Sequence, residues 1–220
     1  MRVRLSLSRL RSQDGFTLVE LMVTIAIMSI SLAMFGSVLA SVQRTAMKED
    51  DLGQSNDQLR LAIEQIDHEM RSGNVLYDPA MENAPVGTVG RIASCSGCLP
   101  SYTMRIYTQT NSPTRSSYMC VLWQIDSQQQ LLTRMWPADT PSEATDWRVV
   151  ATGVVNRALS TPAFAIDADP LKAGRTLNVT FAVNNDLTHD PSGTVTVQAA
   201  YTGRNTSYGY PVSVCGATPT

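Results

Sequence analysis

The chain has 220 residues, an ordinary apolar fraction of 43% and a net charge of −2 at pH 7, which allows one medium domain with an attached element, or two small domains. Four arginines lie among the first fifteen residues, and acidic residues outnumber basic ones in the remainder. Because nucleic-acid binding depends on clustered Lys and Arg, nucleic acid is not an expected partner.

An arginine-rich stretch, Met1 to Gly15, precedes an apolar segment without charge. This segment, Leu21 to Val42, has 22 residues and lies between the first flanking charges, Glu20 and Arg44. As a helix it would span roughly 33 Å, enough to cross a bilayer core of about 30 Å. Because basic residues precede it and acidic residues follow it, we expect a single-pass protein with a cytoplasmic N-terminus and an external ectodomain.

A secretory signal peptide is the alternative interpretation of this N-terminus. Such a peptide has an apolar core of roughly 7–15 residues, followed by a small-residue cleavage site. The apolar run here is longer, and Ala40-Ser41-Val42 is a weak site for signal peptidase. The pattern therefore favours a membrane anchor.

The helical pattern continues beyond the apolar segment. Apolar residues recur there at helical spacing, with polar residues between them: Leu52, Leu59, Ile63, Ile66 and Met70. Gly53 weakens this stretch, and Gly73 is a stop signal. We expect one helix from about Phe16 to Ser72, apolar all round in its first half and amphipathic in its second.

The rest of the chain reads as a connector followed by strands. Residues 73–100 are rich in Pro and Gly, and residues 101–220 contain segments that alternate between apolar and polar side chains. The expected strands are 102–106, 118–125, 131–136, 147–151, 177–183 and 195–201. Short spacings favour an antiparallel sheet, with the amphipathic half of the helix covering its apolar face. The predicted class is α+β.

One motif carries chemical information. Glu20 is a lone carboxylate at the start of an otherwise apolar helix, where burial at the bilayer centre would cost on the order of 2.5–3.5 kcal/mol. A glutamate that reaches the lipid headgroups would explain it without any function. However, Gly15-Phe16-Thr17-Leu18-Val19-Glu20 resembles the cleavage and methylation motif of type IV prepilins and type II secretion pseudopilins.

The resemblance implies a processed filament subunit with a pilin-like fold. A prepilin peptidase would cut after Gly15, remove the leader 1–15 and methylate the new N-terminal Phe16. Glu20 would pair with the Phe16 amine of another subunit and set the axial register, because a buried ion pair is favourable only when both partners are present. The remaining segments would be a transmembrane and filament-core helix (16–43), an amphipathic helix (44–72), the connector (73–100) and the sheet domain (101–220).

One departure from that family concerns helix shape. Many members have a proline in the latter half of the apolar segment, whereas this chain has Gly36-Ser37 there. A kink or local melting at this position is the corresponding expectation.

The four cysteines all follow the apolar segment, which suits disulfides in an oxidising space. Three pairings are open. We favour Cys95 with Cys98, and Cys120 with Cys215, so that the second bond ties the C-terminal part to a strand. Cys95-Ser-Gly-Cys98 could also be redox-active or half of a zinc site, but no second Cys pair or His pair accompanies it.

Catalysis and cofactors are not expected. The only histidines, His68 and His189, are far apart, which gives no basis for a triad or a metalloenzyme site. Oxygen-rich turns at 167–169 and 184–190 could bind calcium, although ordinary turn chemistry explains them. The three tryptophans read as core residues of strands rather than as a ligand surface.

We therefore expect a minor pilin, which initiates assembly or lies at the tip, with a mature chain of 205 residues. The stretch Gln58 to Gly73 resembles the corresponding part of larger minor pilins and pseudopilins. Expected partners are the prepilin peptidase, other pilin subunits, the inner-membrane assembly platform and, before assembly, membrane lipid. The alternatives are a type II secretion pseudopilin, an anchored ectodomain that never polymerises, and a DNA-uptake or adhesion pilin whose arginines gather on one face: Arg91, Arg105, Arg115, Arg134 and Arg148.

Overall fold

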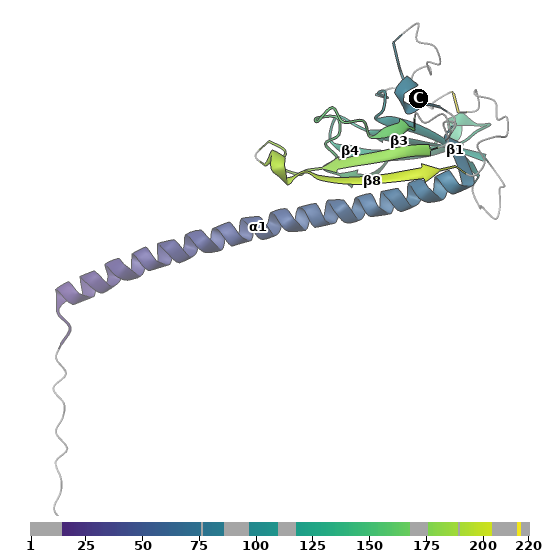
Figure 1. The fold of residues 1–220 in the computed structure, drawn as a ribbon. Helices are drawn as coiled ribbons and strands as arrows, with labels where there is room; N and C mark the ends of the chain where they lie inside the picture. The colour runs from purple at the N-terminus through teal and green to yellow at the C-terminus, as the bar shows by residue number, and fades with distance from the viewer. Residues whose placement is uncertain are drawn as a thin grey trace, which may run out of the picture. The chain divides into compact units, whose positions relative to one another are not determined.

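The computed structural model describes residues 15–75, 77–85, 97–109, 118–167, 176–188, 190–203 and 215–216. The chain divides into two compact units, residues 1–47 and 48–220. One long helix, α1 (Leu18–Ser72), is followed by strands (Figure 1). The strands are β1 (Gly73–Val75), β2 (Thr103–Gln109), β3 (Tyr118–Ile125), β4 (Gln130–Pro137), β5 (Arg148–Thr152), β6 (Phe164–Ile166), β7 (Thr176–Val183) and β8 (Val195–Thr202).

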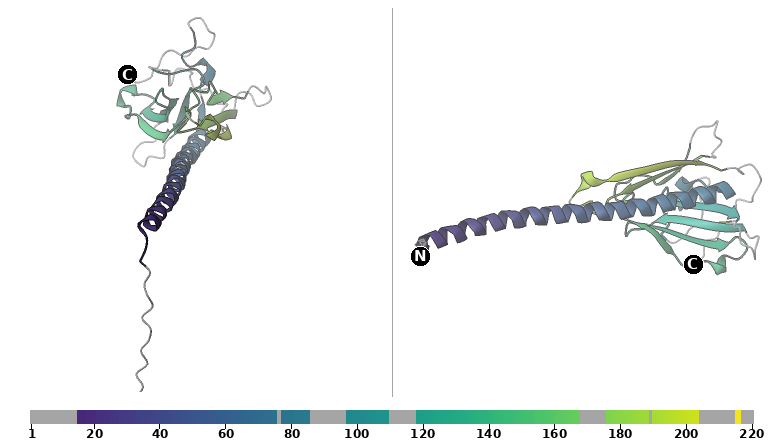
Figure 2. Two further views of the ribbon diagram at one scale, coloured as in Figure 1. Left: turned by 90° about the vertical axis from the view of Figure 1, so that its left-hand side faces the viewer. Right: turned by 90° about the horizontal axis from the view of Figure 1, so that it is seen from below.

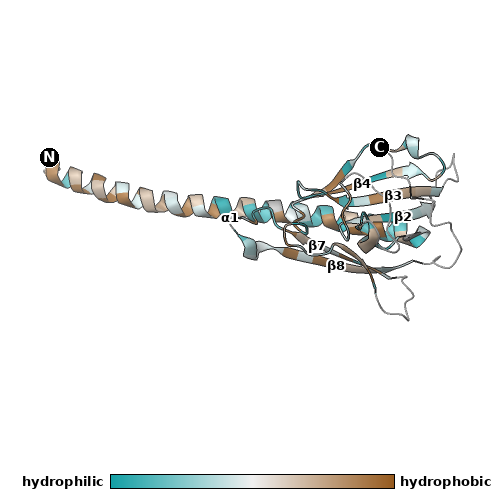
Figure 3. Ribbon diagram, turned by 90° about the horizontal axis from the view of Figure 1, so that it is seen from above, coloured by the Kyte–Doolittle hydropathy of each residue, from teal (hydrophilic) through white to brown (hydrophobic). Residues whose placement is uncertain are grey.

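The first unit contains the N-terminal part of α1. Its large apolar side chains are all exposed, and in Figure 3 apolar residues recur along the helix up to the point where more polar ones begin. The helix continues without interruption through Gly36 and Ser37. The expected local melting is therefore absent from this described segment, because a single exposed glycine weakens a helix by only about 1 kcal/mol.

The second unit contains two antiparallel sheets. Five strands pair in the order β1-β2-β3-β4-β5, and three pair in the order β6-β7-β8. The sequence predicted the six longer strands but only one sheet. It missed β1 and β6, since three residues are too few to display a period of two.

One apolar core joins the second half of α1 to both sheets. Seen from below, this part of the helix runs between the sheets (Figure 2). Leu59, Ile66 and Met70 of the predicted stripe are buried, and they pack with Trp123 of β3 and Phe181 of β7 among others. The amphipathic half of α1 therefore covers the sheets, as its pattern predicts.

Tyr201 on β8 links the same helix to the smaller sheet. Its hydroxyl donates a hydrogen bond of 3.2 Å to the carbonyl oxygen of Ile63. Burial of the ring, together with the charge of Asp67, raises the pKa of Tyr201 to about 12. The hydroxyl therefore stays a donor throughout the physiological range.

The end of α1 is determined by a close backbone approach. Gly73 follows the last helical residue, Ser72, as the sequence predicts, and pairs with Thr108 in the β1–β2 register. A β-carbon on Gly73 would lie 2.8 Å from the Thr108 Cα and 2.9 Å from the Glu69 carbonyl oxygen. Glycine is therefore needed here for space, in addition to its role as a stop signal.

The five-stranded sheet is buried on both faces at β2 and β3. The prediction of one buried face per strand is wrong here, because a second apolar cluster covers the side turned away from α1. Its buried members are Tyr77, Cys98, Tyr107, Cys120, Leu122, Trp136 and Cys215. Residues of the predicted connector and of the C-terminal part of the chain thus form a second layer over the sheet.

Candidate functional site

The first turn of α1 begins at a capping threonine. The Oγ1 atom of Thr17 accepts a hydrogen bond of 3.2 Å from the backbone N–H of Glu20, and its carbonyl oxygen accepts one of 3.2 Å from the N–H of Leu21. Thr17 and Glu20 have the spacing of a capping box, in which a threonine side chain satisfies a free N–H of the first turn. The sequence interpretation missed this role of Thr17, although the T-x-x-E spacing is visible in the sequence.

The cap leaves the peptide bond between Gly15 and Phe16 outside the helix. Residues 15–17 have no regular secondary structure and are exposed, and the Phe16 ring is 80% exposed. Apart from Gly15 and its chain neighbours, no atom of the described residues lies within 4 Å of the position that a β-carbon on Gly15 would take. A protease can therefore approach this bond in an extended chain, without first unwinding a helical turn.

The helix that follows is suited to an apolar environment. It is the one helix among the described residues that is long and apolar enough to cross a membrane. Its hydroxyl groups bond within the helix: Thr24 donates to the Leu21 carbonyl at 2.8 Å, and Ser37 to that of Met34 at 2.7 Å. Such internal bonds satisfy polar side chains where no water is present.

The carboxylate of Glu20 lies one turn from the exposed Phe16. None of the ion pairs between described residues involves Glu20. The first turn thus combines an accessible peptide bond, a helix cap and an acidic side chain on an otherwise apolar surface. The arrangement suits proteolytic processing of the N-terminus and an intermolecular contact through Glu20.

The comparisons with known proteins agree with this geometry. The family model described as the prokaryotic N-terminal methylation motif matches residues 10–36. Neither the curated proteins nor the solved structures gave a match.

The apolar N-terminal helix and its exposed first turn fit a membrane-anchored chain that is processed at its N-terminus. More specifically, the chain carries the prepilin-type N-terminal methylation motif, consistent with a member of the type IV pilin and pseudopilin family. The motif implies processing by a prepilin peptidase and assembly with other pilins, and it indicates a structural subunit rather than an enzyme.

The predicted pairing of Cys120 with Cys215 is present in the structure. This disulfide joins β3 to the C-terminal part of the chain, with the two Cα atoms 5.7 Å apart. Cys98 is also disulfide-bonded. The predicted partner of Cys98 is Cys95, which lies outside the described residues.

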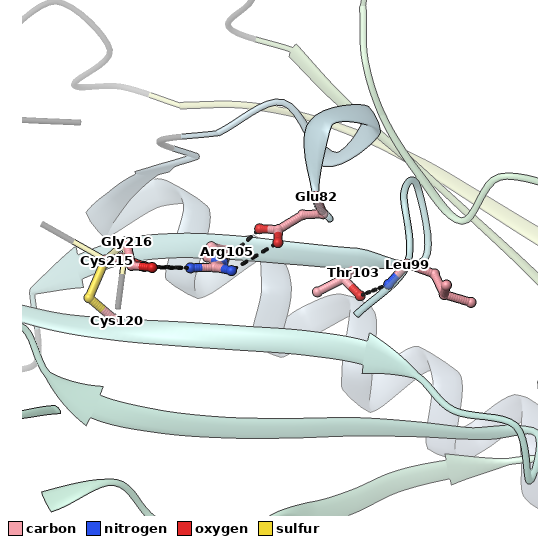
Figure 4. A network of polar contacts seen from close by, with 7 residues as sticks. All are labelled: Glu82, Leu99, Thr103, Arg105, Cys120, Cys215 and Gly216. Carbon is pink, nitrogen blue, oxygen red and sulfur yellow. Dashed lines mark hydrogen bonds and ion pairs between the residues drawn. A yellow bond between two sulfur atoms is a disulfide. The ribbon is translucent and has the colours of Figure 1, made fainter. Parts of the chain in front are cut away.

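The second layer over the five-stranded sheet, called the outer layer below, consists of residues from the predicted connector and from the C-terminal part of the chain. Arg105 joins this outer layer to the sheet, a role that the sequence did not predict (Figure 4). Its Nε lies 2.7 Å from Glu82 Oε1, and its second terminal nitrogen donates a 2.9 Å bond to Glu82 Oε2. The remaining nitrogen donates to the carbonyl oxygens of Cys215 at 2.7 Å and Gly216 at 3.1 Å. Burial raises the pKa of Glu82, and the charge of Arg105 opposes that rise.

Because these contacts bury its guanidinium group, Arg105 cannot belong to the exposed arginine face expected for a DNA-uptake pilin. Arg105 is fully buried, whereas Arg134 packs its guanidinium 4.6 Å from the Trp147 ring centroid. Arg148 donates instead to Gln65 on α1. Arg91 and Arg115 lie outside the described residues. The described arginines therefore give no support to a nucleic-acid surface.

The tryptophan prediction holds for two of the three rings. Trp123 and Trp136 are completely buried, but Trp147 is 38% exposed. Trp147 immediately precedes the edge strand β5, at the border of the five-stranded sheet.

The oxygen-rich turn between β7 and β8 is occupied by structural contacts. Asp186 forms a 3.0 Å ion pair with Lys48, and Asp190 accepts a 3.2 Å bond from the Gly193 N–H. A cavity of about 280 Å³ lies beside them. In the part of the chain that the structure describes, no three acidic, His or Cys groups are placed to hold a metal ion. Asp169 and His189 lie outside the described residues.

Glu69 is a buried acid that the sequence interpretation overlooked. It lies on the stripe of Leu59, Ala62 and Ile66, and the Trp123 Nε1–H donates to its Oε2 at 2.7 Å. His68, in contrast, is exposed. The spacing 59, 62, 66, 69 would have identified Glu69 as a core position.

Proposed function

We propose that this chain is a minor pilin, cut by a prepilin peptidase after Gly15, methylated at Phe16 and assembled through its N-terminal helix. The methylation motif, in register with an exposed peptide bond and an apolar helix, carries this proposal. Before assembly the helix lies in the cytoplasmic membrane, with the ectodomain outside. The inner-membrane assembly platform then adds the subunit to the filament.

Glu20 is the proposed assembly residue. Cleavage leaves a cationic amine at Phe16, and N-methylation keeps that charge. In a low-dielectric filament core, a Glu20 carboxylate that meets the amine of a neighbouring subunit is stabilised, whereas an unpaired carboxylate is strongly penalised. This penalty would select one axial register between subunits.

Mass spectrometry of the intact chain and of its N-terminus tests the processing step. We expect a product that begins at N-methylated Phe16 when a prepilin peptidase is co-expressed, and an unprocessed Met1 terminus without it. A chain that keeps Met1 in the presence of an active peptidase would contradict the proposal.

A second pair of variants tests the assembly step. Glu20→Gln should be processed normally and then fail to enter filaments, because the amide carries no charge to pair with the amine. The matched control is Glu49→Gln, which changes an exposed glutamate of the same helix beyond the apolar segment. Equal incorporation of both variants would reject the role of Glu20.

The resemblance of Gln58 to Gly73 to larger minor subunits supports a position at initiation or at the tip. A type II secretion pseudopilin is the alternative assignment, since the same motif serves both machines. Immunogold labelling distinguishes them: surface pili labelled sparsely or at one end support the minor pilin. Label that depends on a secretion apparatus supports the pseudopilin.

A further inference from the structure

The two sheets have four edge strands, namely β1, β5, β6 and β8. An edge strand exposes unpaired backbone N–H and C=O groups and can pair with a strand of another chain. Soluble proteins usually block such edges with short strands, bulges, charges, prolines or a covering segment. The presence or absence of these features separates the four edges.

Three of the edges are short or blocked. β1 and β6 have three residues each, and the N–H of Phe164 in β6 donates a 2.9 Å bond to the Ser101 carbonyl. β5 is irregular, because its register with β4 shifts between Leu131 and Leu132. The N–H of Thr152 in β5 also donates a 3.2 Å bond to Gln58 of α1.

Within the described part of the chain, β8 has none of these features. Its eight residues, Val-Thr-Val-Gln-Ala-Ala-Tyr-Thr, include no charge, glycine or proline. They pair with β7 without a register shift along the whole strand. At about 3.3 Å per residue the edge is roughly 26 Å long. β8 forms the outer border of its sheet in Figure 3.

The bonds of β7 show which backbone groups of β8 point outward. The backbone N–H of Thr180 donates to the carbonyl oxygen of Ala163, and the carbonyl oxygen of Ala182 accepts from the N–H of Val155. The backbone groups of even-numbered residues in β7 therefore point away from β8. Because backbone groups alternate along a strand, odd-numbered residues of β7 bond to odd-numbered residues of β8 in the observed register. The outward groups therefore belong to Thr196, Gln198, Ala200 and Thr202.

The side chains around this edge also suit an added strand. Those of the four outward residues are exposed, while Val197 and Ala199 on the other face are only partly buried at the rim of the core. No described residue outside β7 bonds to the backbone of Thr196, Gln198 or Ala200. A strand laid along β8 would find three residues, Thr196, Gln198 and Ala200, whose outward backbone groups no other described residue binds, and a half-covered apolar row.

The direction of β8 restricts the partner. The turn before β8 contacts α1 early, where Asn185 bonds to Ser55 at 3.1 Å, and Tyr201 near its end contacts Ile63. β8 thus runs in the same direction as this part of α1. Antiparallel pairing with β8 of a second copy would point residues 48–72 of the two α1 helices in opposite directions, whereas the subunits of a filament in the proposed function share one direction.

We infer that β8 is an assembly edge that accepts a β-strand from a different pilin-type subunit, by strand addition to the three-stranded sheet. The inference rests on the proposed function, because the methylation motif implies assembly with other pilins. The partner contributes an extended segment that lies along β8. Main-chain hydrogen bonds supply most of its binding, as in other cases of β-strand addition.

Photo-crosslinking of the full chain in its native assembly tests the inference. The crosslinker p-benzoylphenylalanine replaces Gln198 in one variant and Gln128, an exposed glutamine in the turn between β3 and β4, in the matched control. Mass spectrometry identifies the crosslinked chain, and immunoblots of purified filaments report incorporation separately. We expect position 198, but not 128, to crosslink to a second chain with its own N-terminal methylation motif.

Proline variants test the backbone contact. Ala200→Pro removes one outward N–H and leaves the β7 ladder intact, so crosslinking from position 198 should fall about tenfold while the chain still folds. Ala199→Pro removes an N–H bonded to β7 and should unfold the sheet. If Ala200→Pro also fails to fold, Thr196→Lys tests the same edge by adding a charge.

The outcomes separate the two proposals. Filaments that contain the chain but give no crosslink from position 198, or equal crosslinking from 198 and 128, overturn the β8 inference and leave the proposed function standing. A crosslinked dimer of this chain alone overturns the choice of partner. A processed chain that never enters filaments overturns both.

Discussion

The indole nitrogen of Trp123 donates a 2.7 Å hydrogen bond to the carboxylate of Glu69 in the core between α1 and the five-stranded sheet. Gln65 donates a second bond of 2.7 Å to the same carboxylate. Burial raises the pKa of Glu69 above its ordinary value of 4.5, and these two bonds, with the nearby charges of Arg148 and His68, oppose the rise. The helix is therefore joined to the sheet through a titrating group.

Glu69 should make stability depend on pH. Because its pKa is higher in the folded state, the folded chain binds a proton more tightly than the unfolded chain. The resulting stabilisation is complete below pH 4.5 and is lost as the pH rises through the raised pKa. In Glu69→Gln this dependence should disappear. Urea unfolding of both full-length proteins in detergent micelles, followed by tryptophan fluorescence between pH 5 and 8, measures the difference.

The difference in unfolding free energy between the two proteins should shift in favour of the variant as the pH rises. A difference that stays constant across this range would mean that Glu69 does not titrate there. Glu82, whose pKa burial also raises, is present in both proteins and cancels in the comparison.

Breaking the buried pair of Arg105 and Glu82 should strongly destabilise the ectodomain. Arg105→Met leaves a buried carboxylate without its partner, at a cost of about 3–5 kcal/mol. The double variant Arg105→Met, Glu82→Leu should recover much of that loss, because no charge remains buried. Arg71→Met, which breaks the exposed pair with Asp67, is the control and should change little. A double variant as unstable as the single one would contradict this account.

The disulfide between Cys120 and Cys215 closes a long loop, with a sequence separation of 95. Replacing both cysteines with alanine frees the unfolded chain from that constraint and should cost about 4 kcal/mol. The urea midpoint of the tryptophan fluorescence transition should fall accordingly, since Trp136 lies in the same cluster as this bond. Adding reductant to the parent protein provides a second comparison. An unchanged midpoint in the variant would refute the prediction.

Gly73→Ala should destabilise the chain by about 1–3 kcal/mol, because its methyl group would be forced against the backbone of β2 and of the last helical turn. Gly53→Ala is the matched control. No atom lies within 4 Å of a β-carbon there, so alanine should stabilise the helix by up to about 1 kcal/mol. Equal effects at the two glycines would show that helix propensity, not space, controls position 73.

The sequence predicted those parts of the fold that repeat over many residues. The apolar run, the helical stripe of Leu59, Ile66 and Met70, and the alternation in β7 and β8 each span several periods, so local pattern is enough to identify them. The motif from Gly15 to Glu20 was visible because five features coincide in register. These predictions needed no knowledge of distant contacts.

The missed features depend on contacts between distant segments. Arg105 reads as a polar, outward residue within β2. Its burial is favourable because Glu82, Cys215 and Gly216, which are far from it in sequence, bind its guanidinium group. The division into two sheets depends on β6, whose three residues carry no periodic signal. Glu69 was overlooked because the stripe of the second half of the helix was identified from apolar residues alone.

The Arg105 network also determines when the outer layer can form. Cys215 follows every strand of both sheets in the chain, yet its carbonyl oxygen and its sulfur both bind residues of the first sheet. In the proposed topology, β2 and β3 leave the membrane long before Cys215 does. The ectodomain therefore completes its outer layer only after translocation of that segment, in a compartment that oxidises thiols.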